Sequence, residues 1–336
     1  MSATPVVDIH SHFLPETWPD LAERFGTPDW PWMRRSEAGK AMLMIGDREF
    51  RPVYDACWNA NRRVEEMDRD GIDLQVISAT PILFAYDRPT QQAADCAQLF
   101  NDLSLEICNK GRGRLLSLSQ VPLQDTDAAC KTLTRAMQDG HAGVQIGNHV
   151  DDRNLDDEGL ITFLQHCATE GAAVLVHPWD MMARERTGKY MMAWTVAMPA
   201  ETQLGIVSMI LGGAFDRLPA TLRLCFAHGG GSFAFLLGRL DNAWRRRDIV
   251  RGESRDVPSS YLDRFYVDSA VFDGAALRFL ADVMGEDRVM LGSDYPFPLG
   301  EKFVGDLIRN APGFSVAARR KLLGGNAEKF LNLAKN

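Results

Sequence analysis

The chain has 336 residues, of which 46% are hydrophobic and 24% are charged, as is usual for a folded globular protein. Its net charge of -8 argues against general binding to nucleic acid or to an anionic membrane surface. The six cysteines are scattered without a C-x-x-C pair, so neither a zinc ribbon nor a disulfide framework is expected. Too few residues precede the first strand for a signal peptide, and no apolar run of ~18 residues occurs, so we expect a cytoplasmic protein without a membrane anchor.

Eight short apolar runs of strand character follow one another along the chain. They cover residues 6–9, 74–78, 115–121, 143–146, 173–177, 222–227, 265–268 and 289–292. Apolar spacing near 3.6 predicts helices between them, over residues 61–70, 91–109, 126–139, 158–170, 199–212, 233–245 and 274–284. Strands alternating with helices predict an α/β protein, a single (β/α)8 TIM barrel domain over residues 1–336.

The connection after the first strand, residues 14–58, is too long for an ordinary barrel loop, and we expect it to form a small inserted subdomain. Residues 48–54 within it are predicted to form a strand that places Arg51 over the barrel mouth. Beyond the last barrel strand, residues 316–333 are expected to form terminal helices that pack on the barrel.

Metal-ligating side chains stand at the ends of several predicted strands. His10 and His12 flank one serine, and side chains at i and i+2 of a strand share a face, so both can reach one cation. His177 and Asp294 end two further runs. Taken singly, such a histidine is more often a core residue, and Asp294 alone could be a helix cap. Together, three imidazoles and a carboxylate suit Zn²⁺, so we expect one zinc ion per chain.

His228 follows the sixth run and opens the glycine-rich sequence His228-Gly229-Gly230-Gly231. It could be a fifth ligand, a general base beside the metal, or a hydrogen-bonded histidine at a helix start. The fourth run ends without a lysine that could be carboxylated to bridge two metals, which favours one ion. No Rossmann or P-loop glycine pattern is present, so no organic cofactor is expected.

Two arginines and two aromatic residues are candidates for contacts with substrate. Arg51 and Arg239 can each bind a carboxylate through paired hydrogen bonds, although a single arginine is more often a surface residue. Trp194 and Phe297 could line a pocket, and either could equally be a packing residue.

Several motifs together resemble the 2-amino-3-carboxymuconate-6-semialdehyde decarboxylases of the amidohydrolase superfamily. They are Asp8–His12, Val176–Met181, Met198–Thr202, Ala227–Gly231 and Gly292–Gly300, and the likeness runs from about residue 6 to about residue 332. The resemblance implies a distorted barrel, zinc held at His10, His12, His177 and Asp294, and a catalytic His228. It also implies that Arg51 and Arg239 bind the substrate's carboxylates, with Arg239 reaching the neighbouring subunit's site in a homodimer.

The implied reaction is the zinc-dependent, non-oxidative conversion of 2-amino-3-carboxymuconate 6-semialdehyde to 2-aminomuconate 6-semialdehyde and CO2, a step of tryptophan or nitrobenzoate catabolism. Two routes stay open: addition of a water activated by His228 before CO2 leaves, or direct protonation of the substrate. The alternatives are a related hydroxybenzoate or carboxymuconate as substrate, hydrolysis of an amide or lactone, and, least favoured, a metal-binding scaffold without activity.

Overall fold

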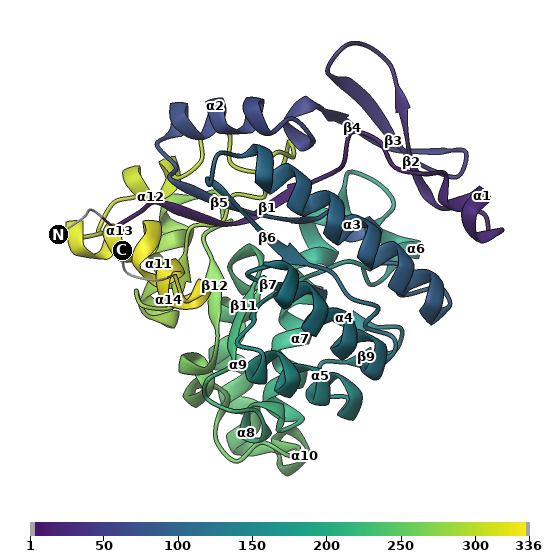
Figure 1. Ribbon diagram of the computed structural model, residues 1–336. Helices are drawn as coiled ribbons and strands as arrows, with labels where there is room; N and C mark the ends of the chain where they lie inside the picture. The colour runs from purple at the N-terminus through teal and green to yellow at the C-terminus, as the bar shows by residue number, and fades with distance from the viewer. Residues whose placement is uncertain (1–3, 334–336) are drawn as a thin grey trace.

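The computed structural model describes residues 4–333, and its centre is a sheet of eight parallel strands (Figure 1). Their order along the sheet is β1 (Val7–Phe13), β5 (Leu74–Ala79), β6 (Leu115–Ser119), β7 (Gly143–Gly147), β10 (Ala173–His177), β11 (Arg223–Phe226), β12 (Tyr266–Asp268) and β13 (Val289–Met290). The Ile9 N–H donates to the Leu291 carbonyl at 2.9 Å, and Ser11 bridges to Tyr295 in parallel, so the last strand returns to the first. The predicted (β/α)8 barrel is confirmed.

Seven helices of eleven or more residues cover the barrel among the described residues. They are α2 (Ala60–Asp70), α3 (Thr90–Lys110), α4 (Thr126–Asp139), α5 (Glu158–Thr169), α7 (Met198–Leu211), α9 (Phe233–Arg246) and α11 (Gly274–Met284). Each coincides with a predicted helix to within one residue at either end. Aspartate or asparagine side chains accept the first free N–H groups of α2, α4, α5 and α11, which is why these helices begin where they do.

Shorter elements join these parts, and most of them were not predicted because segments of two to seven residues carry no clear periodic signal. They are the α-helices α6 (Arg184–Thr187), α8 (Ala214–Arg217), α10 (Asp248–Arg251) and α12 (Asp306–Asn310), the 3-10 helical turns η1 (Asp55–Cys57), η2 (Pro81–Leu83), η4 (His228–Gly230) and η5 (Pro258–Arg264), the π-helical turns η3 (Ala193–Ala197) and η6 (Lys321–Gly325), and the hairpin of β8 (His149–Val150) and β9 (Arg153–Asn154). The terminal helices α13 (Val316–Arg320) and α14 (Asn326–Leu331) lie where they were expected. Within residues 4–333, every helix is too short or too polar to cross a membrane.

The long connection after β1 holds α1 (Leu21–Phe25) and an antiparallel sheet of β2 (Pro31–Arg35), β3 (Lys40–Ile45) and β4 (Arg48–Tyr54). This sheet projects from one end of the barrel in Figure 1, and the strand predicted over residues 48–54 is confirmed. Trp30, Leu43 and Val53 are buried in the same apolar core as the barrel residues. We therefore propose that residues 14–58 are a subdomain folded onto the barrel and not an independent domain.

The largest error in the predicted strand boundaries lies at the end of the first strand. The first strand was expected to end at Ile9, but β1 continues to Phe13 and so includes both histidines of its motif. Beyond a register shift, Ser11 and His12 pair in parallel with Ile77 and Ser78 of β5. Sequence reasoning missed this because polar residues do not look like a fully buried strand.

Candidate metal centre

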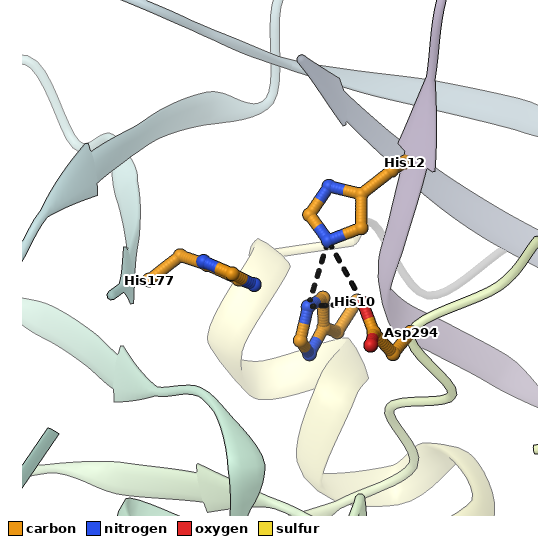
Figure 2. A group of neighbouring side chains, drawn as sticks. All are labelled: His10, His12, His177 and Asp294. Carbon is orange, nitrogen blue, oxygen red and sulfur yellow. Dashed lines mark hydrogen bonds and ion pairs between the residues drawn. The ribbon is translucent and has the colours of Figure 1, made fainter. Parts of the chain in front are cut away.

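Four side chains from three parts of the chain meet at the carboxyl ends of the barrel strands. His10 and His12 come from β1, His177 is the last residue of β10, and Asp294 lies in the loop after β13. One ligand atom of each lies within 4.8 Å of those of the others. Figure 2 shows the His12 ring facing both His10 (Nε2 to Nε2, 3.2 Å) and Asp294 (Nε2 to Oδ1, 3.1 Å). The structure thus brings the four predicted ligands together.

The orientation of His10 is fixed from behind by Asp268, the last residue of β12. Nδ1 of His10 donates to Oδ2 of Asp268 at 2.6 Å, and neither residue is exposed to solvent. The other carboxylate oxygen accepts the N–H groups of Gly229 and Ala270. Because the proton of His10 sits on Nδ1, the lone pair of Nε2 faces the cluster. Sequence reasoning missed Asp268, although its position at the end of the seventh predicted strand could have marked it.

His177 offers the strongest sign that the cluster suits a cation. Its Nδ1 donates to the carbonyl of Pro178 at 2.7 Å, which leaves the lone pair of Nε2 buried and without a hydrogen-bond partner among residues 4–333. A buried polar atom in this state is costly unless something binds it. Three imidazole nitrogens and one carboxylate that converge on one point fit a divalent metal ion.

The protonation of His177 and His12 agrees with that fit. Burial lowers the pKa of His177 well below its usual value and lowers that of His12 to about 4, so both rings are neutral near pH 7, as metal ligands must be. Burial also acts against a charge on His10, but its hydrogen bond to Asp268 and the charges of Asp268 and Asp294 raise its pKa overall. A cation bound at Nε2 of His10 would satisfy the same carboxylates.

His228 lies beside the four ligands on the turn η4 that follows β11. Its ring centroid is 4.9 Å from that of His177 and 5.1 Å from that of His10, and its Nε2 is 4.0 Å from Oδ2 of Asp294. Neither ring nitrogen has a hydrogen-bond partner within residues 4–333. Burial lowers the pKa of His228, so its ring is neutral and able to accept a proton.

Unusual backbone geometry places two of these side chains. His228 and Asp294 have φ angles of 55° and 58°, in the left-handed region that residues other than glycine rarely adopt. After His228 the chain passes so close to α7 that a Cβ atom on Gly231 would lie 2.1 Å from the Pro199 carbonyl oxygen. The glycine-rich sequence is therefore required for the turn that presents His228 to the cluster.

Arg51 on β4 reaches over the same mouth from the inserted sheet. Its guanidinium carbon lies 4.5 Å from the ring centroid of Phe297, 4.9 Å from that of Phe50 and 5.8 Å from that of Trp194. Phe297 in turn lies 5.4 Å from the ring of His12. Within the described part of the chain the Arg51 side chain forms no hydrogen bond or ion pair. It packs against these aromatic faces, and the charge of Asp294 favours its cationic form without direct contact. Phe50 is the contact that sequence reasoning missed.

Arg239 lies elsewhere, on the exposed surface of α9. Its side chain makes no hydrogen bond or ion pair with any of residues 4–333, and Phe235, one helical turn earlier, is 80% exposed. A single chain does not bring Arg239 to the metal ligands, and its role across a dimer stays a prediction. The three histidines that we did not expect to be ligands lie outside the cluster: His141, His149 and His166.

A barrel that holds three histidines and an aspartate at its carboxyl end defines a class of metal-dependent enzyme. The family model described as amidohydrolase matches residues 7–333. The chain therefore belongs to the amidohydrolase family.

Similar proteins narrow this assignment. The 2-amino-3-carboxymuconate-6-semialdehyde decarboxylase of Dictyostelium discoideum is 42% identical over 98% of this chain and 92% of its own length. The apo structure of the IDCase of Metarhizium anisopliae is 26% identical, covers 98% of each chain and has a TM-score of 0.82. The 5-carboxyvanillate decarboxylase of Novosphingobium aromaticivorans, complexed with manganese and a nitrobenzoic acid, is 25% identical over 83% of this chain and 82% of its own, with a TM-score of 0.72. The chain is a metal-dependent carboxy-lyase, and the resemblance to the 2-amino-3-carboxymuconate-6-semialdehyde decarboxylases is confirmed.

Proposed function

We propose that this protein decarboxylates 2-amino-3-carboxymuconate 6-semialdehyde to 2-aminomuconate 6-semialdehyde and uses one zinc ion per chain. It does so as a cytoplasmic homodimer, in the catabolism of tryptophan or nitrobenzoate. The observation that carries the proposal is Arg51. Its side chain is largely buried beside the cluster of metal ligands and forms no ion pair with any of residues 4–333, so it is suited to bind a carboxylate of the substrate. The Dictyostelium relative, which covers nearly the whole chain, supports the choice of substrate.

The zinc ion would be held by His10, His12, His177 and Asp294. When bound, it supplies a Lewis-acid charge that activates water or polarises a substrate oxygen. The preference for zinc follows from the imidazole-rich ligand set, which suits this ion well.

The space around Gly147, the last residue of β7, is consistent with one metal ion and not two. Gly147 pairs with His177 across the sheet, so a side chain there would point towards the metal ligands. A Cβ atom on Gly147 would lie 2.5 Å from Cδ1 of Trp179 and 2.9 Å from Cε2 of Tyr86. These aromatic rings fill the space that a bridging side chain would need, which favours a single ion.

The reaction removes one carboxylate group as CO2 and adds one proton in its place. The C–C bond to that carboxylate breaks, its electron pair passes into the conjugated semialdehyde, and a proton takes the place of CO2 on the carbon. His228 is placed to take this proton from water and pass it on through Nε2, because its ring is neutral, buried and without a competing hydrogen bond among residues 4–333. Arg51 would hold one substrate carboxylate, and the partner subunit's Arg239 would hold the other.

The test is a spectrophotometric assay of the freshly generated semialdehyde with protein that was chelated and then reloaded with zinc or manganese. We expect substrate decay with one CO2 released per turnover, no activity without metal, and about one tightly bound equivalent of zinc per chain. Parallel assays use 2,6-dihydroxybenzoate, an amide and a lactone. Turnover of the hydroxybenzoate alone, or hydrolysis without CO2, would contradict the proposed substrate. Two tightly held equivalents would contradict the single ion.

A further inference from the structure

Asp8 is a fully buried carboxylate of the opening motif that does not join the metal ligands. It accepts four hydrogen bonds from three segments of the chain. Its own strand contributes the N–H of His10 (3.2 Å), β5 contributes Nε2 of Gln75 (2.8 Å), and the loop after β13 contributes both the N–H (3.1 Å) and the hydroxyl (2.6 Å) of Ser293. One carboxylate therefore connects the two strands to the loop.

That loop carries a metal ligand, since Ser293 directly precedes Asp294. The N–H groups of both residues also donate to the carbonyl of His10, at 3.2 and 3.0 Å. Asp8 and the His10 carbonyl thus hold this end of the loop from two sides. Any shift of Ser293 would move the Asp294 carboxylate relative to the ring of His12, which lies 3.1 Å from it.

The second anchor is Arg63 of α2, a side chain that is only 1% exposed. Its Nη1 donates to Oε1 of Gln75 at 2.8 Å and to Oγ of Ser11 at 3.2 Å, while Nη2 donates to the carbonyl of His12 at 2.5 Å. Its guanidinium carbon also lies 4.9 Å from the ring centroid of Tyr295, which follows Asp294. Among residues 4–333 it has no ion-pair partner, and burying a charge in this way is costly.

We propose that Asp8, supported by Gln75 and Arg63, is a positioning residue that sets the distance between the β1 histidines and Asp294. The hydrogen bonds run without a break from Arg63 of α2, through Gln75, to Asp8 and then to Ser293, which directly precedes the ligand Asp294. This inference rests on the proposed metal site. Partners of this kind fix the geometry of a metal site although they do not touch the ion.

The test replaces Asp8 by asparagine, which keeps the shape but presents an NH2 group to donors on Ser293 and Gln75. A matched control is Asp241→Asn on α9. Asp241 is also buried and accepts both the N–H (3.0 Å) and the hydroxyl (2.7 Å) of one serine, Ser259, but it lies outside the metal cluster. Three quantities are measured: zinc affinity against a chromophoric chelator, the visible absorption of the cobalt-loaded protein, and the thermal midpoint of the metal-free protein.

We expect Asp8→Asn to weaken zinc binding ~10- to 100-fold and to change the cobalt spectrum. Asp241→Asn should lower the thermal midpoint without changing either metal readout. If Asp8→Asn does not fold, Ser293→Ala is used instead. It removes the hydroxyl that donates to Asp8 and accepts the N–H of Tyr295 (3.1 Å), and it should still weaken zinc binding severalfold. The inference would be overturned if the folded variants of Asp8 or Ser293 kept the wild-type zinc affinity and cobalt spectrum. It would also be overturned if Asp241→Asn lost as much zinc affinity as they do. Neither result would contradict the metal site itself. A wild-type protein that takes up no metal would overturn both.

Discussion

Replacing Arg51 by alanine removes the cation that lies among Phe297, Phe50 and Trp194. A charge-assisted contact to a carboxylate contributes roughly 1.5–3 kcal/mol, and 1.4 kcal/mol corresponds to a factor of ten, so kcat/KM should fall about 10- to 150-fold. Because the guanidinium is largely buried, water and salt screen the contact only weakly. Arg51→Lys keeps the charge but loses the paired geometry, so its loss should be smaller.

The assay for this prediction is steady-state decay of the semialdehyde by zinc-loaded protein, with zinc content and thermal midpoint measured on the same samples. If Arg51 binds the substrate and the transition state alike, KM rises more than kcat falls. Arg34→Ala is the matched control, since Arg34 belongs to the same small sheet but is exposed and paired with Glu49. A folded, zinc-loaded Arg51→Ala protein with kcat/KM within about twofold of the wild type would refute the reasoning.

Four further variants test the other roles. His177→Ala should lose metal together with activity, whereas His228→Ala should keep the metal and lose about 10²-fold or more in turnover; loss of metal from the second would make His228 a ligand. Mixing inactive Arg239→Ala and His228→Ala chains should restore some activity, because a hybrid dimer has one site with both residues; inactive hybrids verified by mass spectrometry would refute the contact between subunits. Burial lowers the pKa of His141 from 6.5 to about 4 in the folded protein. As the pH falls below 6.5, this side chain takes up a proton in the unfolded chain but not yet in the folded one, so stability is lost between pH 6.5 and 4. In urea unfolding at pH 5, the wild type should lose roughly 2 kcal/mol more of its free energy of unfolding than His141→Gln does. Any metal loss at this pH affects both proteins alike. Equal losses in the two proteins would contradict the lowered pKa of His141.

The sequence alone determined the barrel and its four candidate metal ligands. Apolar runs of strand length alternate with helical spacing, and parallel strands all present their carboxyl ends at the same mouth. A histidine or aspartate at such an end must therefore approach the others, whatever the loops between them do. His10, His12, His177 and Asp294 could be predicted for this reason, although they lie as much as 284 positions apart in the chain.

Only the tertiary structure decided what supports those ligands. Arg63 and Asp8 have no local pattern that distinguishes them from other polar residues of helices and strands. The strand-end position of Asp268 places it near the mouth but does not tell that it bonds to His10 from behind. Their roles depend on distances between segments remote in the sequence. A pattern of period two tells which face of a strand a side chain takes, but the hydrogen-bond partner on that face depends on register and on the packing of neighbouring segments.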